Sequence, residues 1–284
     1  DTGDMKILYP LAKRFIAGHD FESAKPVIQK MIDDGYEVSV DYIGENSTCY
    51  TQCRKAYKQY LQIIRDLQDC NLDISIKPSQ LGLNIHPYLS YIFLNNLARK
   101  AARLGHTIRL DMEDSSVTEL TRNLAISLHE KHGNVGVAIQ ANLYRTEQDL
   151  KILIEKGVSV RLVKGAYKES EDISYQTLEQ VRSSFYAHAA HLYSEKANKP
   201  AIATHDEGLL DDINELIPNS NEFFDYEFLY GIRRDVQKKC KLEGKRVRIY
   251  IPFGTQWLPY TIRRLKEWKN LKFVIKNIFK EWFK

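Results

Sequence analysis

The sequence predicts an α/β protein, a distorted (β/α)8 barrel of the TIM type, and three observations lead to this expectation. Eight apolar, β-branched runs that end in polar or glycine residues recur along the 284 residues. Between most of them lie amphipathic stretches with apolar residues three and four apart, which is typical of helices. Strands that alternate with helices need crossover connections and are therefore parallel. No GxGxxG or GxxxxGK[ST] motif follows the first run, which disfavours a doubly wound sheet, the main alternative.

The expected elements follow one another without a low-complexity linker, so one domain over residues 1–284 is predicted. Within it, residues 1–35 form an N-terminal helical segment, 36–270 the barrel and 271–284 a C-terminal amphipathic helix. The helix at 21–35 (FESAKPVIQKMIDDG) is expected to close the bottom of the barrel, and a helix after the eighth strand to cover its mouth. The eight strands are expected within 36–45, 72–82, 107–115, 135–143, 158–167, 200–207, 223–231 and 246–254.

Composition excludes several classes of protein. A hydrophobic fraction of 43% is enough for a large core, and the net charge of +4 is spread along the chain, so no nucleic-acid partner is expected. No apolar run is long enough to cross a bilayer. The four cysteines show neither a disulfide framework nor zinc-ligand spacing, which favours reduced thiols in a cytosolic protein.

Polar residues gather where the expected strands end. In such barrels the reactive groups lie at the C-terminal ends of the strands, and so many polar groups would be unfavourable if they were buried without partners. They therefore predict a polar mouth around a bound ligand. These strand ends carry Asp41, Glu45, Lys77, Asp111, Glu113, Asp114, Gln140, Arg161, Lys164, Thr204, His205, Asp206, Glu227 and Tyr250.

Each of these residues alone also has a simpler interpretation. His205 can be a hydrogen-bonded structural histidine, and Asp111 can cap the helix that the sequence DSSVTEL begins. Lys77 and Lys164 can be solvated residues at the rim. The collective pattern favours a site.

The charges at the mouth are mainly positive. Such a site suits an anionic ligand, or a cofactor that becomes anionic on reduction. No set of residues has the spacing of a metal cage, and no GxSxG motif of a serine hydrolase is present. After the eighth strand, Tyr260, Arg263, Arg264 and Glu267 share a helix face, either as an exposed surface pair of arginines or as a fork for a small carboxylate.

The strand-end motifs, in order, resemble those of the stand-alone bacterial proline dehydrogenases. They are SIKPSQLG, IRLDMEDS, VAIQANLYRTEQDL, VRLVKGAY, ATHDE, EFLYGIR and YIPFGTQWLPYTIRRLKE. The resemblance implies a distorted (β/α)8 barrel that holds FAD. It also implies oxidation of L-proline to Δ1-pyrroline-5-carboxylate, the first step of proline catabolism, by hydride transfer to flavin N5. The electrons would pass to a membrane quinone, and a separate pyrroline-5-carboxylate dehydrogenase would act next.

The resemblance implies roles for individual residues as well. Asp111 and Arg161 would be catalytic, Arg161 donating toward flavin N5 and Asp111 fixing Lys77. Glu45 would pair with Arg263 as a gate. The proline carboxylate would contact Lys77, Arg263 and Arg264, and its ring Tyr167, Leu229, Tyr250 and Tyr260. FAD would contact Met112, Gln140, Arg161, Lys164, Gly165, Ala166, Thr204 and His205.

Three positions qualify the resemblance. Lys168 stands where bifunctional relatives have an aromatic residue, and Glu227 stands where a glutamine is expected, so the FAD contacts there differ. Tyr250 matches members that use proline, whereas a smaller residue would favour hydroxyproline.

Other interpretations remain open from the residues alone. A lysine with a depressed pKa, Lys77 or Lys164, would suit a Schiff-base aldolase. A barrel that only binds a carboxylate is a further alternative. In residues 271–284, lysines every four residues oppose aromatic and aliphatic ones, either as a helix packed on the barrel or as a membrane-surface helix. The second option predicts a bacterial cytoplasmic protein associated peripherally with the inner face of the membrane.

Overall fold

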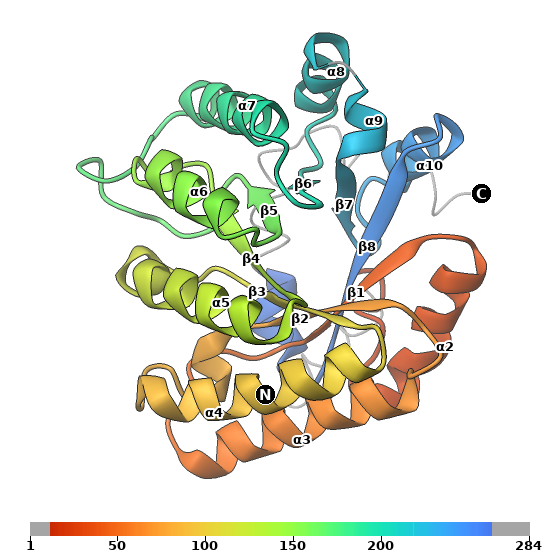
Figure 1. The fold of residues 1–284 in the computed structure, drawn as a ribbon. Coiled ribbons are helices and arrows are strands. Elements are labelled where there is room, and N and C mark those ends of the chain that lie inside the picture. The colour runs from red at the N-terminus through yellow and green to blue at the C-terminus, as the bar shows by residue number, and fades with distance from the viewer. Residues whose placement is uncertain (1–11, 218, 263–284) are drawn as a thin grey trace.

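Eight parallel strands form a closed barrel in the computed structural model of the chain, which describes residues 12–217 and 219–262 (Figure 1). Each strand pairs with its sequence neighbours, and β1 also pairs with β8, which closes the ring. The predicted barrel and the order of its eight strands are confirmed. The strands are β1 Glu37–Tyr42, β2 Leu72–Ile76, β3 Thr107–Leu110, β4 Val135–Gln140, β5 Val160–Val163, β6 Ala201–Ala203, β7 Asp225–Leu229 and β8 Arg246–Phe253.

Helices surround the barrel and follow the strands in alternation (Figure 1). Local sequence signals set several of their ends: Asp20 and Thr177 begin α2 and α7 with capping boxes, and Gly133 ends α5 in the left-handed conformation. The helices are α2 Phe21–Asp33, α3 Tyr50–Asp66, η1 Pro78–Leu81, α4 Pro87–Arg103, η2 Ser115–Val117, α5 Thr118–His132, α6 Thr146–Glu155, α7 Leu178–Ser194, α8 Glu207–Leu216, α9 Ser220–Phe223 and α10 Arg234–Leu242.

The main apolar core lies between the strands and the helices, not inside the barrel. Outward-facing strand residues such as Val40, Ile74 and Ile108 are fully buried, as are helix residues such as Ile63 and Leu97. Successive strand side chains point to opposite faces, so one face of each strand joins this shell and the other faces the barrel axis. The shell supplies the hydrophobic stabilisation, which leaves the interior available for polar groups.

Helix α2 does not close the bottom of the barrel, contrary to the sequence-based expectation. Its N-terminal end lies near the end of β8, where the Ala17 N–H donates to the Pro252 carbonyl and the Gly254 N–H to that of Gly18. The ring of Phe21 packs on that of Phe253, with centroids 5.7 Å apart. From there α2 runs along the outer wall to the start of β1 (Figure 1). It therefore occupies the lateral slot between β8 and β1, because its apolar face matches that part of the shell.

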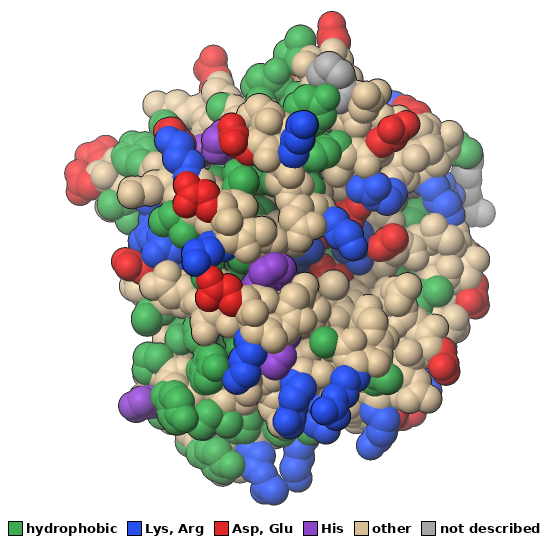
Figure 2. Space-filling model, in the orientation of Figure 1, with side chains coloured by type: hydrophobic (Ala, Val, Ile, Leu, Met, Phe, Trp, Pro, Cys, Tyr) green, Lys and Arg blue, Asp and Glu red, His purple; other side chains and the backbone are tan. Residues whose placement is uncertain are grey.

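The segment after β8 begins a further helix over residues 257–262. Trp257 and Tyr260 are buried there with Phe15 and Ile43 in a second apolar cluster, beside Leu229. On the surface, Figure 2 shows that basic side chains gather over α3, which carries exposed Arg54, Lys55, Lys58 and Arg65. Among the described residues, no helix is both long enough and apolar enough to span a membrane.

Candidate active site at the barrel mouth

The interior of the barrel is polar. The inward-facing positions alternate along the strands, as the two-residue period requires. Small residues on the neighbouring strands leave room for long side chains: Ala138 of β4 and Ala201 of β6 flank Arg161 in register. A Cβ on Gly136 would lie 2.8 Å from Nη1 of Arg109, so this glycine makes space for a guanidinium. The polar inward set is Ser39, Asp41, Asp73, Ser75, Arg109, Asp111, Arg161, Glu227, Arg248 and Tyr250.

Arg161 lies at the centre of this set and is 3% exposed. Its Nη1 donates to Ser75 Oγ at 3.0 Å and to Asp111 Oδ1 at 2.8 Å. Its Nη2 donates to Ser39 Oγ at 2.9 Å and to Asp73 Oδ2 at 3.1 Å. Burial lowers the pKa of Arg161, but the surrounding carboxylates raise it by more, so the guanidinium stays charged. Arg161 thus joins the polar residues deep in the barrel, here called the floor, to those at its mouth.

At the mouth, Asp111 connects three of the predicted residues. Tyr250 donates its hydroxyl hydrogen to Oδ2 of Asp111 at 2.6 Å, and Nζ of Lys77 lies 3.5 Å from the same oxygen. Lys77 also lies 3.4 Å from Oδ1 of Asp41. Asp111 does not cap the next helix: Asp114 does, by accepting the N–H of Ser116 at 2.9 Å. Asp111 is therefore available to the interior.

The electrostatics of Lys77 argue against a Schiff-base lysine. Burial lowers its pKa, but the carboxylates of Asp41 and Asp111 raise it by more, so its pKa lies above the ordinary value. An imine-forming lysine needs the opposite shift, because its amine must be neutral to attack. Burial, and the charges of Asp111 and Asp41, raise the pKa of Tyr250 in turn, so this phenol stays a hydrogen-bond donor.

The backbone around Lys77 is held by a buried carboxylate. Lys77 follows β2 and directly precedes η1. Ser79 of η1 donates its N–H to Glu113 Oε2 at 3.0 Å and its hydroxyl to Oε1. The Glu113 carbonyl in turn accepts from Nε2 of Gln140 at 2.9 Å. The ends of β2, β3 and β4 are thereby tied together, which fixes Lys77 relative to Asp111.

A second group of polar residues follows β5 and β6. Lys164 forms an ion pair with Asp206 at 2.5 Å, and Arg182 of α7 donates to the same carboxylate at 3.0 Å. Burial raises the pKa of Asp206, but Lys164, the Leu209 N–H and Arg182 together lower it by more, so the net shift is downward. The two cations border the mouth on the side opposite Lys77's strand.

The backbone at Gly165, which has φ +113°, lies close to the side chain of Asn142. A Cβ there would lie 2.2 Å from Oδ1 of Asn142, so only glycine fits. That buried oxygen has no hydrogen-bond partner among the described residues. Next to it, the Ala166 N–H faces Oε1 of Gln140 at 3.4 Å. Exposed backbone and an unsatisfied amide oxygen are features of a surface that receives a ligand.

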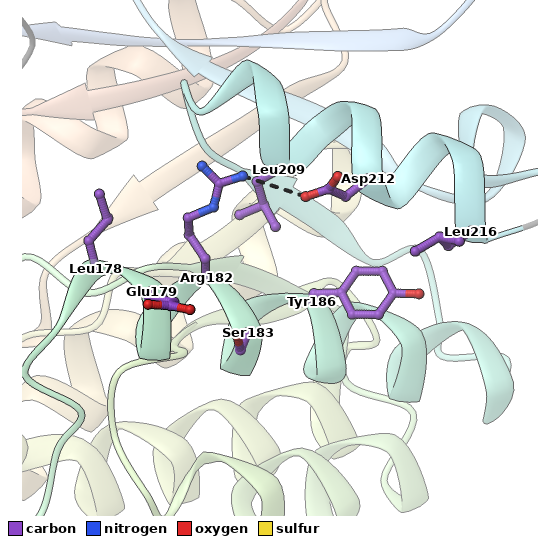
Figure 3. Close-up of a pocket in the computed structure, with 8 residues that line it drawn as sticks. All are labelled: Leu178, Glu179, Arg182, Ser183, Tyr186, Leu209, Asp212 and Leu216. Atoms are coloured by element: carbon purple, nitrogen blue, oxygen red, sulfur yellow. Dashed lines mark hydrogen bonds and ion pairs between the residues drawn. The ribbon is translucent and has the colours of Figure 1, made fainter.

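Arg182 also borders a groove between α7 and α8 (Figure 3). Figure 3 shows its side chain reaching across to α8, where Nη2 lies 3.5 Å from Oδ2 of Asp212. Leucines and a tyrosine form the apolar part of the groove: Leu178, Tyr186, Leu209 and Leu216.

The other predicted residues fall into small groups around the mouth. The hydroxyl of Tyr167 lies 3.4 Å from Oε2 of Glu45, which joins the loop after β5 to the loop after β1. Nε2 of His205 accepts the N–H of Leu229 at 2.9 Å, which is a structural hydrogen bond. Met112 is buried in the main core, and Thr204 accepts the N–H of Asp206 at 3.2 Å. Arg263, Arg264, Glu267 and the helix at 271–284 lie outside the described residues, so the fork and its pairing with Glu45 do too.

Several site residues were missed by the reasoning from sequence. Asp73, Arg109 and Arg248 lie deeper in the strands than the strand ends where reactive groups were sought. Their signal was present, because Arg109 and Arg248 stand two residues from the predicted Asp111 and Tyr250, and Asp73 stands four from Lys77. Asn142 and Arg182 gave no signal of that kind, since Asn142 lies in the loop after β4 and Arg182 on α7, and their partners Gly165 and Asp206 come from other segments.

Comparison with known proteins gives a consistent result. A family model described as proline dehydrogenase matches residues 24–276. Proline dehydrogenase 2 of Bacillus subtilis is 32% identical, over 95% of this chain and 91% of its own. Proline dehydrogenase of Deinococcus radiodurans is also 32% identical, over 96% and 91%. Among solved structures, proline utilization A (PutA) from Bdellovibrio bacteriovorus has a similar fold, with TM-score 0.84 and 23% identity over 94% of this chain, which spans 33% of PutA.

Proposed function

The chain belongs to the proline dehydrogenase family and catalyses the first step of proline catabolism, and from this premise we propose how its site works. L-proline is oxidised to Δ1-pyrroline-5-carboxylate with FAD as cofactor, and a membrane quinone takes the electrons. The observation that carries the proposal is the cluster of Lys77, Asp111, Arg161 and Tyr250 at the barrel mouth. A separate pyrroline-5-carboxylate dehydrogenase would use the product.

The residues beyond β5 and β6 fit a flavin dinucleotide. Lys164 and Arg182 are cations that suit a pyrophosphate, and they already share an anionic partner, Asp206. The backbone at Gly165 carries no side chain, and Oδ1 of Asn142 beside it is unsatisfied within the described part of the chain. Both features suit a planar group lying on the backbone. When bound, FAD supplies an N5 atom that accepts the hydride from the proline ring carbon next to nitrogen. Met112, Gln140, Ala166, Thr204 and His205 complete the proposed lining.

Lys77 would bind the substrate carboxylate. Its charge is secured by Asp41 and Asp111, and its backbone is fixed through Ser79 and Glu113. Its Nζ is held by contacts of 3.4 and 3.5 Å, which are loose enough to be exchanged for a carboxylate. Substrate binding at a prearranged cation orients the proline ring, which is a large part of the rate enhancement available to such a site.

Arg161 and Asp111 would act as a unit. Arg161 would supply positive charge next to the flavin ring, where negative charge develops on reduction. This role is electrostatic. Both of its Nη atoms already donate to protein acceptors, so a bond from either one to the flavin would require that an acceptor such as Asp111 be shared. Asp111 holds the Tyr250 hydroxyl, which keeps the phenol ring in position against the substrate.

The remaining contacts are proposed from the resemblance and from the placement of their described members. Tyr167, Leu229 and Tyr260 would form the wall around the proline ring; Leu229 packs beside Tyr260 and Tyr167 faces Glu45. Arg263 and Arg264 would complete the carboxylate fork, with Glu45 as a gate on Arg263. The amphipathic pattern of 271–284 supports peripheral contact with the inner face of a bacterial membrane, with the protein in the cytoplasm.

Anaerobic titration with L-proline, followed by flavin absorbance, tests this proposal. The purified protein is expected to be yellow and to bleach on addition of L-proline. Arg264→Met should raise the proline concentration needed by tenfold or more, whereas Glu147→Gln, a change at an exposed residue that pairs with Lys151, should not. A wild type that binds flavin and stays oxidised with proline refutes the function. Unchanged proline binding in Arg264→Met refutes the carboxylate fork.

A further inference from the structure

Glu227 is a buried carboxylate between two arginines. It lies on β7 facing the barrel axis and is 2% exposed. Its Oε2 contacts Nε of Arg161, and its Oε1 lies 3.5 Å from Nε of Arg248. Neither oxygen has a hydrogen-bond partner among the described residues, so these contacts are ionic. A carboxylate buried in this way is tolerated only beside opposite charge.

The contacts indicate that Glu227 is ionised. Each carboxylate oxygen lies next to the Nε of a charged guanidinium, and such close positive charge favours the ionised carboxylate over the neutral acid. Arg109 lies in the same cluster through Asp73, which contacts both Arg109 and Arg161. Burial raises the pKa of Glu227, whereas Arg161, Arg248 and Arg109 lower it, with a net shift upward. The geometry, with three arginines around one carboxylate, favours the charged form.

Glu227 contacts the side of Arg161 that the other acceptors leave open. Asp111 and Ser75 accept from Nη1, Ser39 and Asp73 accept from Nη2, and Glu227 faces Nε. A planar guanidinium that donates from both Nη atoms and contacts a carboxylate at Nε is restricted in its rotation about its stem. Glu227 therefore sets the plane of the guanidinium and also offsets part of its charge.

We propose that Glu227 is a positioning residue for Arg161, which holds the guanidinium through Nε and lowers the reduction potential of the bound flavin. The inference rests on the proposed function, because it requires a flavin next to Arg161. A carboxylate near the flavin disfavours the additional negative charge of the reduced ring, and it weakens the positive field of Arg161. A glutamine, which the family resemblance predicts at this position, would keep the shape without the charge.

The potential of the bound flavin tests the charge effect without measuring turnover. It is measured with a reference dye in the holoenzyme, by stepwise chemical reduction in the absence of proline. Glu227→Gln is expected to shift the reduction equilibrium about tenfold toward the reduced form, or about 30 mV for a two-electron couple. Asp225→Asn removes the same charge beside Arg248 without touching Arg161, and should shift it by less than half as much.

The same measurement separates charge from simple damage to the fold. Glu227→Asp keeps the charge but shortens the side chain, so the potential should stay closer to that of the wild type than in Glu227→Gln. Potentials of Glu227→Gln and Asp225→Asn that agree within error overturn the charge effect. A lower thermal midpoint alone, with an unchanged potential, shows that Glu227 only stabilises the barrel, which also overturns it.

The positioning of Arg161 can be tested in the protein with or without bound flavin. Arginine Nε–H signals in a 1H–15N spectrum report the group directly, and the signal of Arg161 is identified by its absence in Arg161→Lys. In the wild type it should exchange slowly with water, and in Glu227→Gln it should move and exchange at least tenfold faster. An unchanged signal refutes the positioning role. Because this result does not depend on proline or flavin, it distinguishes failure of the inference from failure of the proposed function.

Discussion

The floor and the mouth of the barrel interior contain the same types of charged residue, but these residues have different roles. At the floor, Arg109 donates to Asp73 at 3.2 Å and to the Ser159 hydroxyl at 3.1 Å. Arg248 donates to Glu37 at 2.7 Å and to Asp225 at 2.9 Å. At the mouth the contacts of Lys77 are 3.4 and 3.5 Å. The floor arginines therefore make shorter contacts with their partners than Lys77 makes at the mouth, and the longer contacts of Lys77 are easier to exchange for a ligand.

Asp73 and Asp41 show the difference most directly, since both are buried carboxylates on neighbouring strands. Burial raises the pKa of Asp73, but three arginines lower it by more, to about 2. Burial also raises the pKa of Asp41, and there Lys77 does not fully offset it, so the net shift is upward. One oxygen of Asp41 has no hydrogen-bond partner within the described part of the chain. Full pairing marks a structural role, and incomplete pairing marks a place where a ligand is received.

Arg161→Met should have the largest effect, because Arg161 belongs to both regions. Its loss leaves Asp73, Asp111 and Glu227 buried without a main partner, which should lower the free energy of unfolding by about 3–5 kcal/mol. Reduction by proline should be lost as well. Urea denaturation and flavin bleaching measure the two effects. A variant as stable as the wild type would show that the floor does not depend on this bridge.

Asp73→Asn should affect stability and leave the mouth intact. The charge of Asp73 contributes about 2 kcal/mol at neutral pH, from the difference between its ordinary pKa of 3.8 and its pKa of about 2. Because its pKa is depressed in the folded state, this contribution is present above pH 4 and is lost as the pH falls toward 2.

Unfolding midpoints of the wild type and of Asp73→Asn, measured between pH 5 and pH 2, check this dependence. The midpoint of the variant should be lower at pH 5 and should change less on acidification. Proline affinity of the folded variant, at neutral pH, should be within about threefold of that of the wild type, since Lys77 and Tyr250 are untouched. An equal slope in both proteins would contradict the role assigned to Asp73.

Lys77→Met should show the opposite balance, with a functional loss and a small change in stability. The affinity for proline should fall by about 10- to 100-fold, the equivalent of one charge-assisted hydrogen bond. Stability should change by only about 1 kcal/mol, because Asp41 and Asp111 can share a proton when the cation is removed. Proline titration and thermal unfolding provide the two numbers. A large loss of stability with normal proline affinity would reverse the assignment of mouth and floor.

Lys156→Ala should have the smallest effect and serves as the surface reference. Lys156 and Glu130 form an ion pair at 2.7 Å, but both side chains are half exposed. Solvent and salt screen such a pair, so no resolvable change in the unfolding midpoint or in proline reduction is expected. A clear destabilisation would show that ion-pair distance, not burial, governs the contribution of charges in this protein.

The amino-acid pattern was sufficient for the barrel and for much of its mouth. Eight β-branched runs between helical stretches require parallel strands, and strand ends are read directly from the order of residues. Lys77, Asp111, Arg161 and Tyr250 were found in this way, and the structure brings them into contact. The prediction of the barrel is confirmed because strand period and crossover geometry are local properties of the chain, whereas the roles of these four residues stay predictions.

The partners of those residues depended on the closed barrel. Glu227 and Arg161 are 66 residues apart in the sequence and meet only because eight strands share one axis. The depth of Asp73, the space that Gly136 leaves for Arg109 and the lateral slot taken by α2 follow from the register between strands and from side-chain volumes. Such long-range packing is not encoded at any single position, and it is packing that divides one polar interior into a paired floor and an open mouth.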